Sequence, residues 1–254
     1  MLELRGVGRN FGGLAALSDV SFRAATGEVT ALIGPNGAGK STLINCATGI
    51  DRPDTGEVLL NGQPITGLPA HRVARLGVAR TFQNLRLFPR LSVLDNVLCG
   101  LTVQAGGSLL GALLRPPALR NRERRLRLQA LAALDRFNLT ALADWPVGVL
   151  AYGDRKRVEL ARAVVSEPRL LLLDEPVAGL NATETAAVGN EIRRLRTQGY
   201  TLLLVEHDME LVMSVADRVV VLDGGRCIAC GTPDEVRRNP LVLEAYLGKT
   251  SLVA

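Results

Sequence analysis

The stretch from Gly34 to Thr42 has the residue types and spacing of a loop that binds phosphate groups. It fits the pattern G-x-x-x-x-G-K-[ST] and lies between a predicted strand and a predicted helix. Glycines let successive backbone N–H groups turn toward one anion, and the helix N-terminus adds the positive end of its dipole. Lys40 is then expected to reach the β- and γ-phosphates of a nucleotide, while the Ser41 hydroxyl ligates Mg²⁺. The predicted phosphate-binding residues are Gly34, Pro35, Asn36, Gly37, Ala38, Gly39, Lys40, Ser41 and Thr42.

Two adjacent acidic residues, Asp174 and Glu175, follow the apolar run Leu170–Leu173. Strand ends of this kind are where ligands bind in parallel sheets. Asp174 fits a role in holding Mg²⁺ through a water molecule, and Glu175 can then accept a proton from the attacking water as general base. His207 follows the next apolar run and is expected to hydrogen-bond the γ-phosphate and orient the water. A capping or core histidine is the ordinary alternative, and it is the interpretation given to His71, which lies in no motif.

Short apolar runs alternate with helical patterns and predict the elements that hold these residues. Strands are expected at residues 28–33, 57–60, 78–82, 170–173, 201–205 and 219–222. Asn61–Gly62 predicts a tight hairpin turn. An amphipathic helix is expected over Asn121–Phe137, after a segment between Gly106 and Pro117 that glycine and proline interrupt. The basic run Arg120–Arg127 is interpreted as a solvated face, with contact to lipid headgroups or a partner as the alternative. Buried strands alternating with helices indicate an α/β fold with a mostly parallel sheet.

Composition and charge limit the class of protein. The 254 residues are 47% hydrophobic and 22% charged, which is typical of a folded globular chain. A formal charge of +5 fits a polyphosphate ligand or an anionic membrane surface. No apolar run approaches the roughly 20 residues that span a bilayer, and the first residues do not form a signal peptide, so a cytoplasmic protein is expected. Cys227 and Cys230 form a CxxC without a second ligand pair, which favours ordinary packing over metal or redox chemistry.

Three further segments identify the class of nucleotide hydrolase. Leu150–Asp154 (LAYGD) leads into a helix shortly before Asp174, the position of the ABC signature that is usually LSGGQ. Gln83, within RTFQ, matches the Q-loop of that family, His207 matches its switch histidine, and Ala178–Asn181 matches its D-loop. With these motifs in order, the whole chain resembles an ABC transporter ATPase.

Other segments resemble the larger ATP-binding subunit of the high-affinity branched-chain amino acid importers. They are Phe11–Leu17, Arg80–Phe88, Ser92–Val97, Glu175–Asn181 and Asn239–Gly248. The long insert before the signature also suits that subunit better than its shorter companion. Two alternatives stay open: the ATPase of another ABC system, such as an amide or urea importer or an exporter, and a non-transport ABC ATPase. Against the second, the chain has neither sustained coiled-coil heptads nor a second cassette.

The resemblance implies a P-loop core of RecA type with a mostly parallel sheet, an N-terminal antiparallel β subdomain and an inserted α-helical subdomain. Residues 1–254 would be one ABC domain, with its core at 1–86 and 167–254 and the helical subdomain with the signature at 87–166. ATP and Mg²⁺ would be the cofactors. Gln83 would ligate Mg²⁺ and link the γ-phosphate to the transmembrane subunits. Phe11 would stack on adenine, with a position in the core as the alternative.

The resemblance also implies partners. Two ATPase subunits, identical or different, would pair head to tail and hold two ATP molecules, each between one phosphate loop and the opposing signature. Ala151 and Gly153 would thus contact the ATP of the partner. Two transmembrane permease subunits and a periplasmic or extracellular solute-binding protein would complete the system, with no nucleic acid. The chain would lie peripherally on the inner face of the membrane.

Three positions depart from the usual motifs. Ala151 replaces the signature serine, Asp154 replaces its final glutamine, and Asn181 replaces the commoner aspartate of the D-loop. A lost hydroxyl bond to a charged oxygen costs about 1.5–3 kcal/mol. We therefore expect these residues to weaken the half-site that the chain offers its partner, but not its own phosphate loop, Glu175 or His207.

Overall fold

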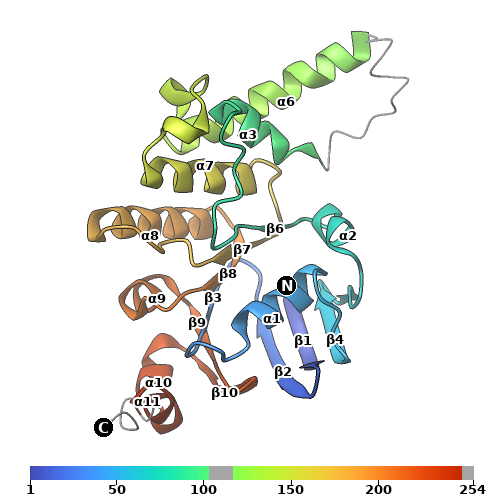
Figure 1. Ribbon diagram of the computed structural model, residues 1–254, viewed down its shortest axis with the longest axis vertical. Coiled ribbons are helices and arrows are strands. Elements are labelled where there is room, and N and C mark those ends of the chain that lie inside the picture. Colours follow the sequence, from blue (N-terminus) through green and yellow to red (C-terminus); the bar gives the residue numbers. More distant parts are fainter. Residues whose placement is uncertain (103–116, 248–254) are drawn as a thin grey trace. The chain divides into compact units, whose positions relative to one another are not determined.

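The computed structural model describes residues 1–102 and 117–247, and it divides the chain into two compact units (Figure 1). The first unit comprises Met1–Val78 and Arg169–Ala254, and the second comprises Ala79–Pro168. The glycine- and proline-interrupted segment expected from Gly106 lies outside the described residues, except for Pro117, where a helix begins.

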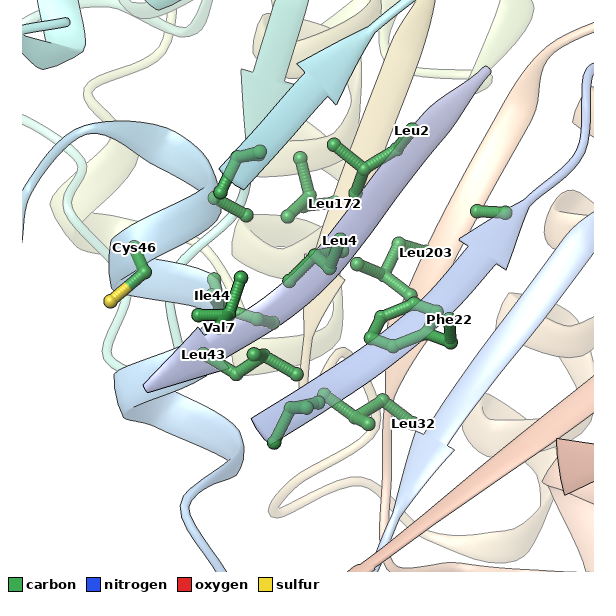
Figure 2. Packing of buried hydrophobic residues seen from close by; sticks show 14 of the residues in the cluster. Leu2, Leu4, Val7, Phe22, Leu32, Leu43, Ile44, Cys46, Leu172 and Leu203 are labelled. Carbon is green, nitrogen blue, oxygen red and sulfur yellow. The ribbon is translucent and has the colours of Figure 1, made fainter. Parts of the chain in front are cut away.

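An antiparallel sheet forms the N-terminal part of the first unit. Its strand order is β2-β1-β4-β5, with β1 at Leu2–Phe11, β2 at Leu14–Ala24, β4 at Thr55–Leu60 and β5 at Gln63–Pro64. The predicted turn between β4 and β5 is confirmed, because Asn61 and Gly62 both have positive φ, 52° and 78°, as a two-residue hairpin requires. One face of this sheet packs its apolar residues against helix α1 and strands of the second sheet (Figure 2).

The second sheet of this unit is parallel in its centre. Its order is β10-β9-β3-β8-β7-β6, with β3 at Val29–Ile33, β6 at Val78–Arg80, β7 at Leu170–Asp174, β8 at Thr201–Val205, β9 at Arg218–Asp223 and β10 at Arg226–Gly231. Every residue of β3, β7 and β8 is buried, which explains why these strands are continuous apolar runs in the sequence. The α/β fold class, with an antiparallel N-terminal sheet and a parallel core sheet, is confirmed. Cys227 and Cys230 lie on the edge strand β10 as free thiols.

Helices of the first unit follow the strands in the alternation that the sequence predicts. They are α1 (Lys40–Thr48), α2 (Ala70–Arg75), α8 (Ala182–Thr197), α9 (Met209–Val215), α10 (Pro233–Arg237) and α11 (Pro240–Leu247). The residues of α1 that face inward, Leu43 and Ile44, are fully buried in the core beneath β1 (Figure 2). This packing fixes the start of α1, where the phosphate loop ends.

The second unit contains only helices and irregular segments where the structure describes it, apart from Ala79 and Arg80, which end β6. Its elements are α3 (Val93–Cys99), α6 (Pro117–Arg136), α7 (Tyr152–Val164) and the 3₁₀ turns η1 (Thr140–Leu142) and η2 (Val147–Val149). The amphipathic helix expected at residues 121–137 is confirmed as α6, which starts four residues earlier than expected.

Strand β6 is shorter than the sequence predicts. It was expected to reach Phe82 but ends at Arg80. The N–H group of Phe82 donates to Glu159 Oε1 at 3.4 Å, so a side chain of α7 takes the place of a strand partner. Within residues 1–102 and 117–247, no helix is both long and apolar enough to cross a membrane.

Candidate functional site

The phosphate loop lies between the buried strand β3 and helix α1, and two of its glycines are required by sterics. Gly34 has φ 150°, and a Cβ atom there would lie 2.1 Å from the carbonyl oxygen of Leu222. Gly39 has φ 97°, and its Cβ atom would lie 2.6 Å from the carbonyl oxygen of Ala16. Both neighbours are backbone atoms that cannot move aside cheaply, so only glycine lets the loop pass so close to them.

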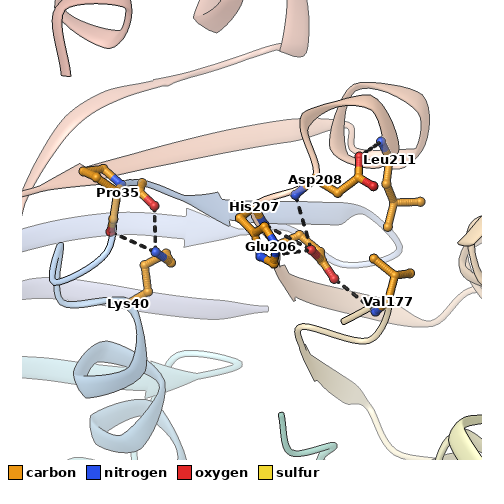
Figure 3. Close-up of polar contacts among 8 residues, drawn as sticks. Pro35, Lys40, Val177, Glu206, His207, Asp208 and Leu211 are labelled. Carbon is orange, nitrogen blue, oxygen red and sulfur yellow. Dashed lines mark hydrogen bonds and ion pairs between the residues drawn. The ribbon is translucent and has the colours of Figure 1, made fainter. Parts of the chain in front are cut away.

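Lys40, the first residue of α1, folds back across this loop. Its ammonium group donates to the carbonyl oxygens of Gly34 at 2.7 Å and Pro35 at 3.0 Å (Figure 3). Burial lowers the pKa of the ammonium, and the carboxylates of Glu175 and Asp174 act in the opposite direction. The positive charge is therefore held inside the curve of the loop and within the electrostatic reach of both acids.

Three neighbouring parallel strands bring the predicted residues of the first unit to one edge of the sheet. In the order β3, β8, β7, the first strand ends directly before Gly34, the second ends two residues before His207, and the third ends at Asp174. Asp174 is buried and pairs in register with Val205, the last residue of β8. Glu175 has a left-handed backbone, φ 46°, and its N–H donates to the carbonyl oxygen of Val205 at 2.9 Å. The chain thus turns sharply at the carboxylate predicted to be the general base.

Glu206 is a buried acid that the sequence interpretation did not assign. It directly follows β8, and its side chain reaches toward the loop after β7 (Figure 3). Its side chain is completely buried, and Oε1 accepts the N–H of Val177 at 3.1 Å. Its other oxygen, Oε2, accepts the N–H groups of His207 at 3.0 Å and Asp208 at 3.4 Å. The sequence carried one signal of this role, an acid directly continuing the fully buried strand β8.

His207 combines a fixed backbone with an outward side chain. Its N–H is held by Glu206, whereas 65% of its side chain is exposed. Asp208 follows as the N-cap of α9, because its Oδ1 accepts the N–H of Leu211 at 3.0 Å. The imidazole therefore lies at the surface of the first unit, at the edge of the sheet where β7 ends with Asp174.

Phe11 lies at the tip of the hairpin between β1 and β2. Gly12 and Gly13, both with positive φ, form the turn after it. The ring is 44% exposed, and the guanidinium of Arg9 lies 4.7 Å from its centroid. The alternative of a core position for Phe11 is therefore wrong. The same hairpin passes the phosphate loop, since the backbone of Ala16 adjoins Gly39.

The remaining predicted residues belong to the second unit and are described within it. Gln83 is exposed in an irregular segment after β6, while Ala151 and Gly153 start α7. Glu159, a buried residue of α7, accepts the N–H of Phe82 and lies 3.8 Å from the guanidinium of Arg162. Inside this unit the Gln83 segment is therefore tied to the signature helix through the residue beside it.

The start of α7 has no side-chain cap. Ala151 occupies the N-cap position with φ −58° and ψ 155° and makes no side-chain hydrogen bond. Asp154, in the first turn, forms an ion pair with Arg157. Asn181, the D-loop departure, is different because it caps α8 in a capping box with Glu184, at 3.0 Å in both directions. Asn and Asp serve equally well as caps, which gives this substitution a local explanation.

Comparison with protein families gives two matches. Residues 17–178 match the family described as "ABC transporter". Residues 226–250 match the family described as "Branched-chain amino acid ATP-binding cassette transporter". Among curated proteins, the chain is 44% identical to the high-affinity branched-chain amino acid transport ATP-binding protein BraF of Pseudomonas aeruginosa, over 98% of each chain.

Solved structures give the same picture. The ADP conformation of MJ1267, an ATP-binding cassette of an ABC transporter, is 32% identical with a TM-score of 0.85 and covers 98% of both chains. The ATP-binding cassette MJ0796, in a dimeric post-hydrolysis state bound to ADP and phosphate, is 25% identical with a TM-score of 0.76. It covers 92% of this chain and 99% of its own.

Proposed function

Because the chain belongs to the ABC transporter family and is an ATPase, we propose that it powers an importer of branched-chain amino acids. The observation that carries the substrate class is the 44% identity to BraF over 98% of both chains. The match of residues 226–250 to a branched-chain amino acid cassette family supports it independently, because that segment lies outside the residues of the general family match.

ATP would bind along the edge of the parallel sheet. The backbone N–H groups of the phosphate loop would surround the phosphates, and Lys40 would exchange its two carbonyl partners for phosphate oxygens. Phe11, exposed at its hairpin tip beside the loop, would stack on the adenine. Ser41 and Thr42, which follow Lys40 in the first turn of α1, would present their hydroxyls to the same phosphates.

The residues present fit a magnesium ion bound jointly by protein and nucleotide. Mg²⁺ keeps several waters and takes one or two protein oxygens together with substrate phosphates. Consistent with that, the described residues include no cluster of three or more His, Cys, Asp or Glu that could hold a metal alone. The Ser41 hydroxyl, the Asp174 carboxylate and the Gln83 amide would supply the oxygens. When bound, the ion would neutralise charge on the phosphate oxygens.

Hydrolysis would then depend on the two side chains that follow β7 and β8. Glu175 would accept the proton of the attacking water, and the exposed imidazole of His207 would hydrogen-bond the γ-phosphate and orient that water. The sharp left-handed turn at Glu175, held by its N–H bond to Val205, supports this role because it fixes the backbone that carries the carboxylate at the sheet edge.

In the assembly that the family suggests, the chain would lie on the inner face of a membrane. Two ATPase subunits, identical or different, would pair so that the signature of each, with Ala151 and Gly153, contacts the ATP of the other. The first unit would act as the core expected at 1–86 and 167–254, and the second as the signature subdomain expected at 87–166. Two permease subunits and a solute-binding protein would complete the importer.

Reconstitution tests the substrate class. The full chain, assembled with candidate permease subunits and a candidate solute-binding protein, would be placed in vesicles. Uptake of radiolabelled leucine, isoleucine, valine, short amides and urea would be measured with and without ATP. Saturable, ATP-dependent uptake of the branched-chain amino acids is expected. ATP-dependent uptake confined to amides or urea, or export, would contradict the proposal.

A further inference from the structure

Glu206 occupies a position that no motif of the family assigns. It follows β8 directly, and its carboxylate reaches across to the loop after β7. One oxygen receives the N–H of Val177 and the other receives the N–H groups of His207 and Asp208 (Figure 3). The side chain thus joins the turn that starts at Glu175 to the turn that carries His207.

A buried carboxylate destabilises the fold unless its oxygens accept hydrogen bonds. Burying an ion costs several kcal/mol, and backbone N–H donors that lose an acceptor cost about 1–3 kcal/mol each. Burial raises the pKa of Glu206, and the three N–H donors counteract that rise. Water cannot readily replace the carboxylate as the acceptor of the Val177 N–H, because both Glu206 and Val177 are buried.

We propose that Glu206 is a positioning residue that holds the general base Glu175 and the switch histidine His207 in one fixed arrangement. The inference deepens the proposed function and rests on the roles assigned there to these two residues. Glu175 and Val177 lie two residues apart in one turn, and His207 is the neighbour of Glu206. A displacement of about 1 Å between two catalytic groups costs up to a hundredfold in rate, so a single shared anchor controls turnover without touching ATP.

Replacing Glu206 by Gln separates this role from simple packing, because the two side chains have nearly the same shape. Glutamine has one acceptor oxygen and one N–H donor group in place of two acceptors. Whichever way its amide points, one of the two loops meets a donor where it needs an acceptor. The phosphate loop lies on a different strand end and keeps all of its own contacts.

The test measures steady-state ATP hydrolysis by the full chain in its assembled transporter, together with affinity for a fluorescent ATP analogue and thermal denaturation. For Glu206→Gln, kcat is expected to fall about 10- to 100-fold while the dissociation constant of the analogue changes less than about threefold. Hydrogen exchange of the Val177 or His207 amide should become faster. Glu28→Gln, which removes a half-buried charge at the opposite end of β3, is the matched control and should leave kcat and the dissociation constant of the analogue unchanged.

An unchanged kcat in Glu206→Gln would overturn the proposal. So would a parallel loss of kcat, nucleotide affinity and denaturation temperature, which indicates a general scaffold residue. If that variant does not fold, Glu206→Asp keeps the charge but shortens the reach, so a reduced kcat at unchanged affinity is expected and a wild-type kcat overturns the idea. Glu175→Gln is measured alongside: an active Glu175→Gln contradicts the proposed base, whereas an inactive one with an active Glu206→Gln contradicts only this inference.

Discussion

The phosphate loop of the first unit and the start of α7 in the second unit are both glycine-containing helix N-termini, but they differ in their supporting side chains. The phosphate loop has an ammonium group folded into it and two carboxylates within electrostatic reach. At the start of α7, Ala151 provides no side-chain hydrogen bond, and Asp154 is paired with Arg157. A helix N-terminus therefore provides backbone donors in both places, whereas only the first has its full set of side chains.

This difference teaches where substitutions are tolerated. The first site would perform chemistry on a bond, so each side chain would have a separate task at a fixed distance. The second would only hold an anion presented by a partner, and backbone N–H groups at a helix N-terminus do that without side chains. We therefore expect large effects from changes at the sheet edge and small ones at the start of α7.

The largest effect is expected at the general base. In Glu175→Gln the amide cannot accept a proton from water, and kcat should fall about 10²- to 10⁴-fold. ATP affinity should be retained, because the carboxylate does not bind the phosphates. Single-turnover hydrolysis and equilibrium binding of ATP by the assembled complex measure the two quantities. Hydrolysis near the wild-type rate in this variant would show that Glu175 is not the general base.

Lys40→Ala should lower nucleotide affinity instead. The substitution deletes the ammonium that lies inside the loop, and a hydrogen bond to a charged group contributes about 1.5–3 kcal/mol. The dissociation constant for ATP should therefore rise about 10- to 100-fold, measured by calorimetry on the full chain. The control Lys156→Ala removes the other described lysine, which belongs to α7, and should leave the phosphate-loop affinity unchanged. Equal affinities in Lys40→Ala and the wild type would contradict the phosphate-loop assignment.

A matched pair of glycine variants tests the backbone of the loop. At Gly37, with φ 81°, an added Cβ meets nothing within 4 Å, so alanine should cost only the left-handed backbone strain of about 1–2 kcal/mol. Gly34→Ala adds a clash at 2.1 Å with Leu222 and should cost about 1–3 kcal/mol more. Urea unfolding gives both free energies, and equal losses would mean that the close approach at Gly34 relaxes freely.

The sequence predicted the sheet and the place of the phosphate loop between a strand and a helix because both depend on local patterns. Fully buried strands such as β7 and β8 are continuous apolar runs, and Asn61–Gly62 specifies its own turn. Glu206 could not be placed, because its bond to Val177 spans 29 residues and appears only when β7 and β8 are neighbours. The end of β6 was missed for the same reason, since the acceptor of Phe82 is a distant residue of α7.

The smallest effect is expected where the signature serine is missing. A serine hydroxyl at position 151 can accept the N–H of Asp154 as an N-cap and donate to a phosphate oxygen at the same time. With alanine at this position, solvent must accept the N–H of Asp154, and no hydroxyl is available to donate to the phosphate oxygen. Asp154 adds a negative charge, but the helix N-terminus favours it by about 0.3–1 kcal/mol, so the charge is partly offset while the missing hydroxyl is not.

Ala151→Ser should therefore tighten ATP binding about tenfold, and only at the site formed with the phosphate loop of the partner subunit. Where the partner is a different ATPase, affinities measured separately at the two sites should show the weaker site, at the partner's phosphate loop, tightening toward the other, with little change at Lys40. Ala151→Gly is the matched control, because glycine is a fair N-cap without a hydroxyl and should leave ATP affinity unchanged. Equal tightening at both sites, or none at either, would mean that backbone or water already supplies the bond. Alanine would then be a neutral residue at the start of α7, and the asymmetry between the two nucleotide sites would disappear.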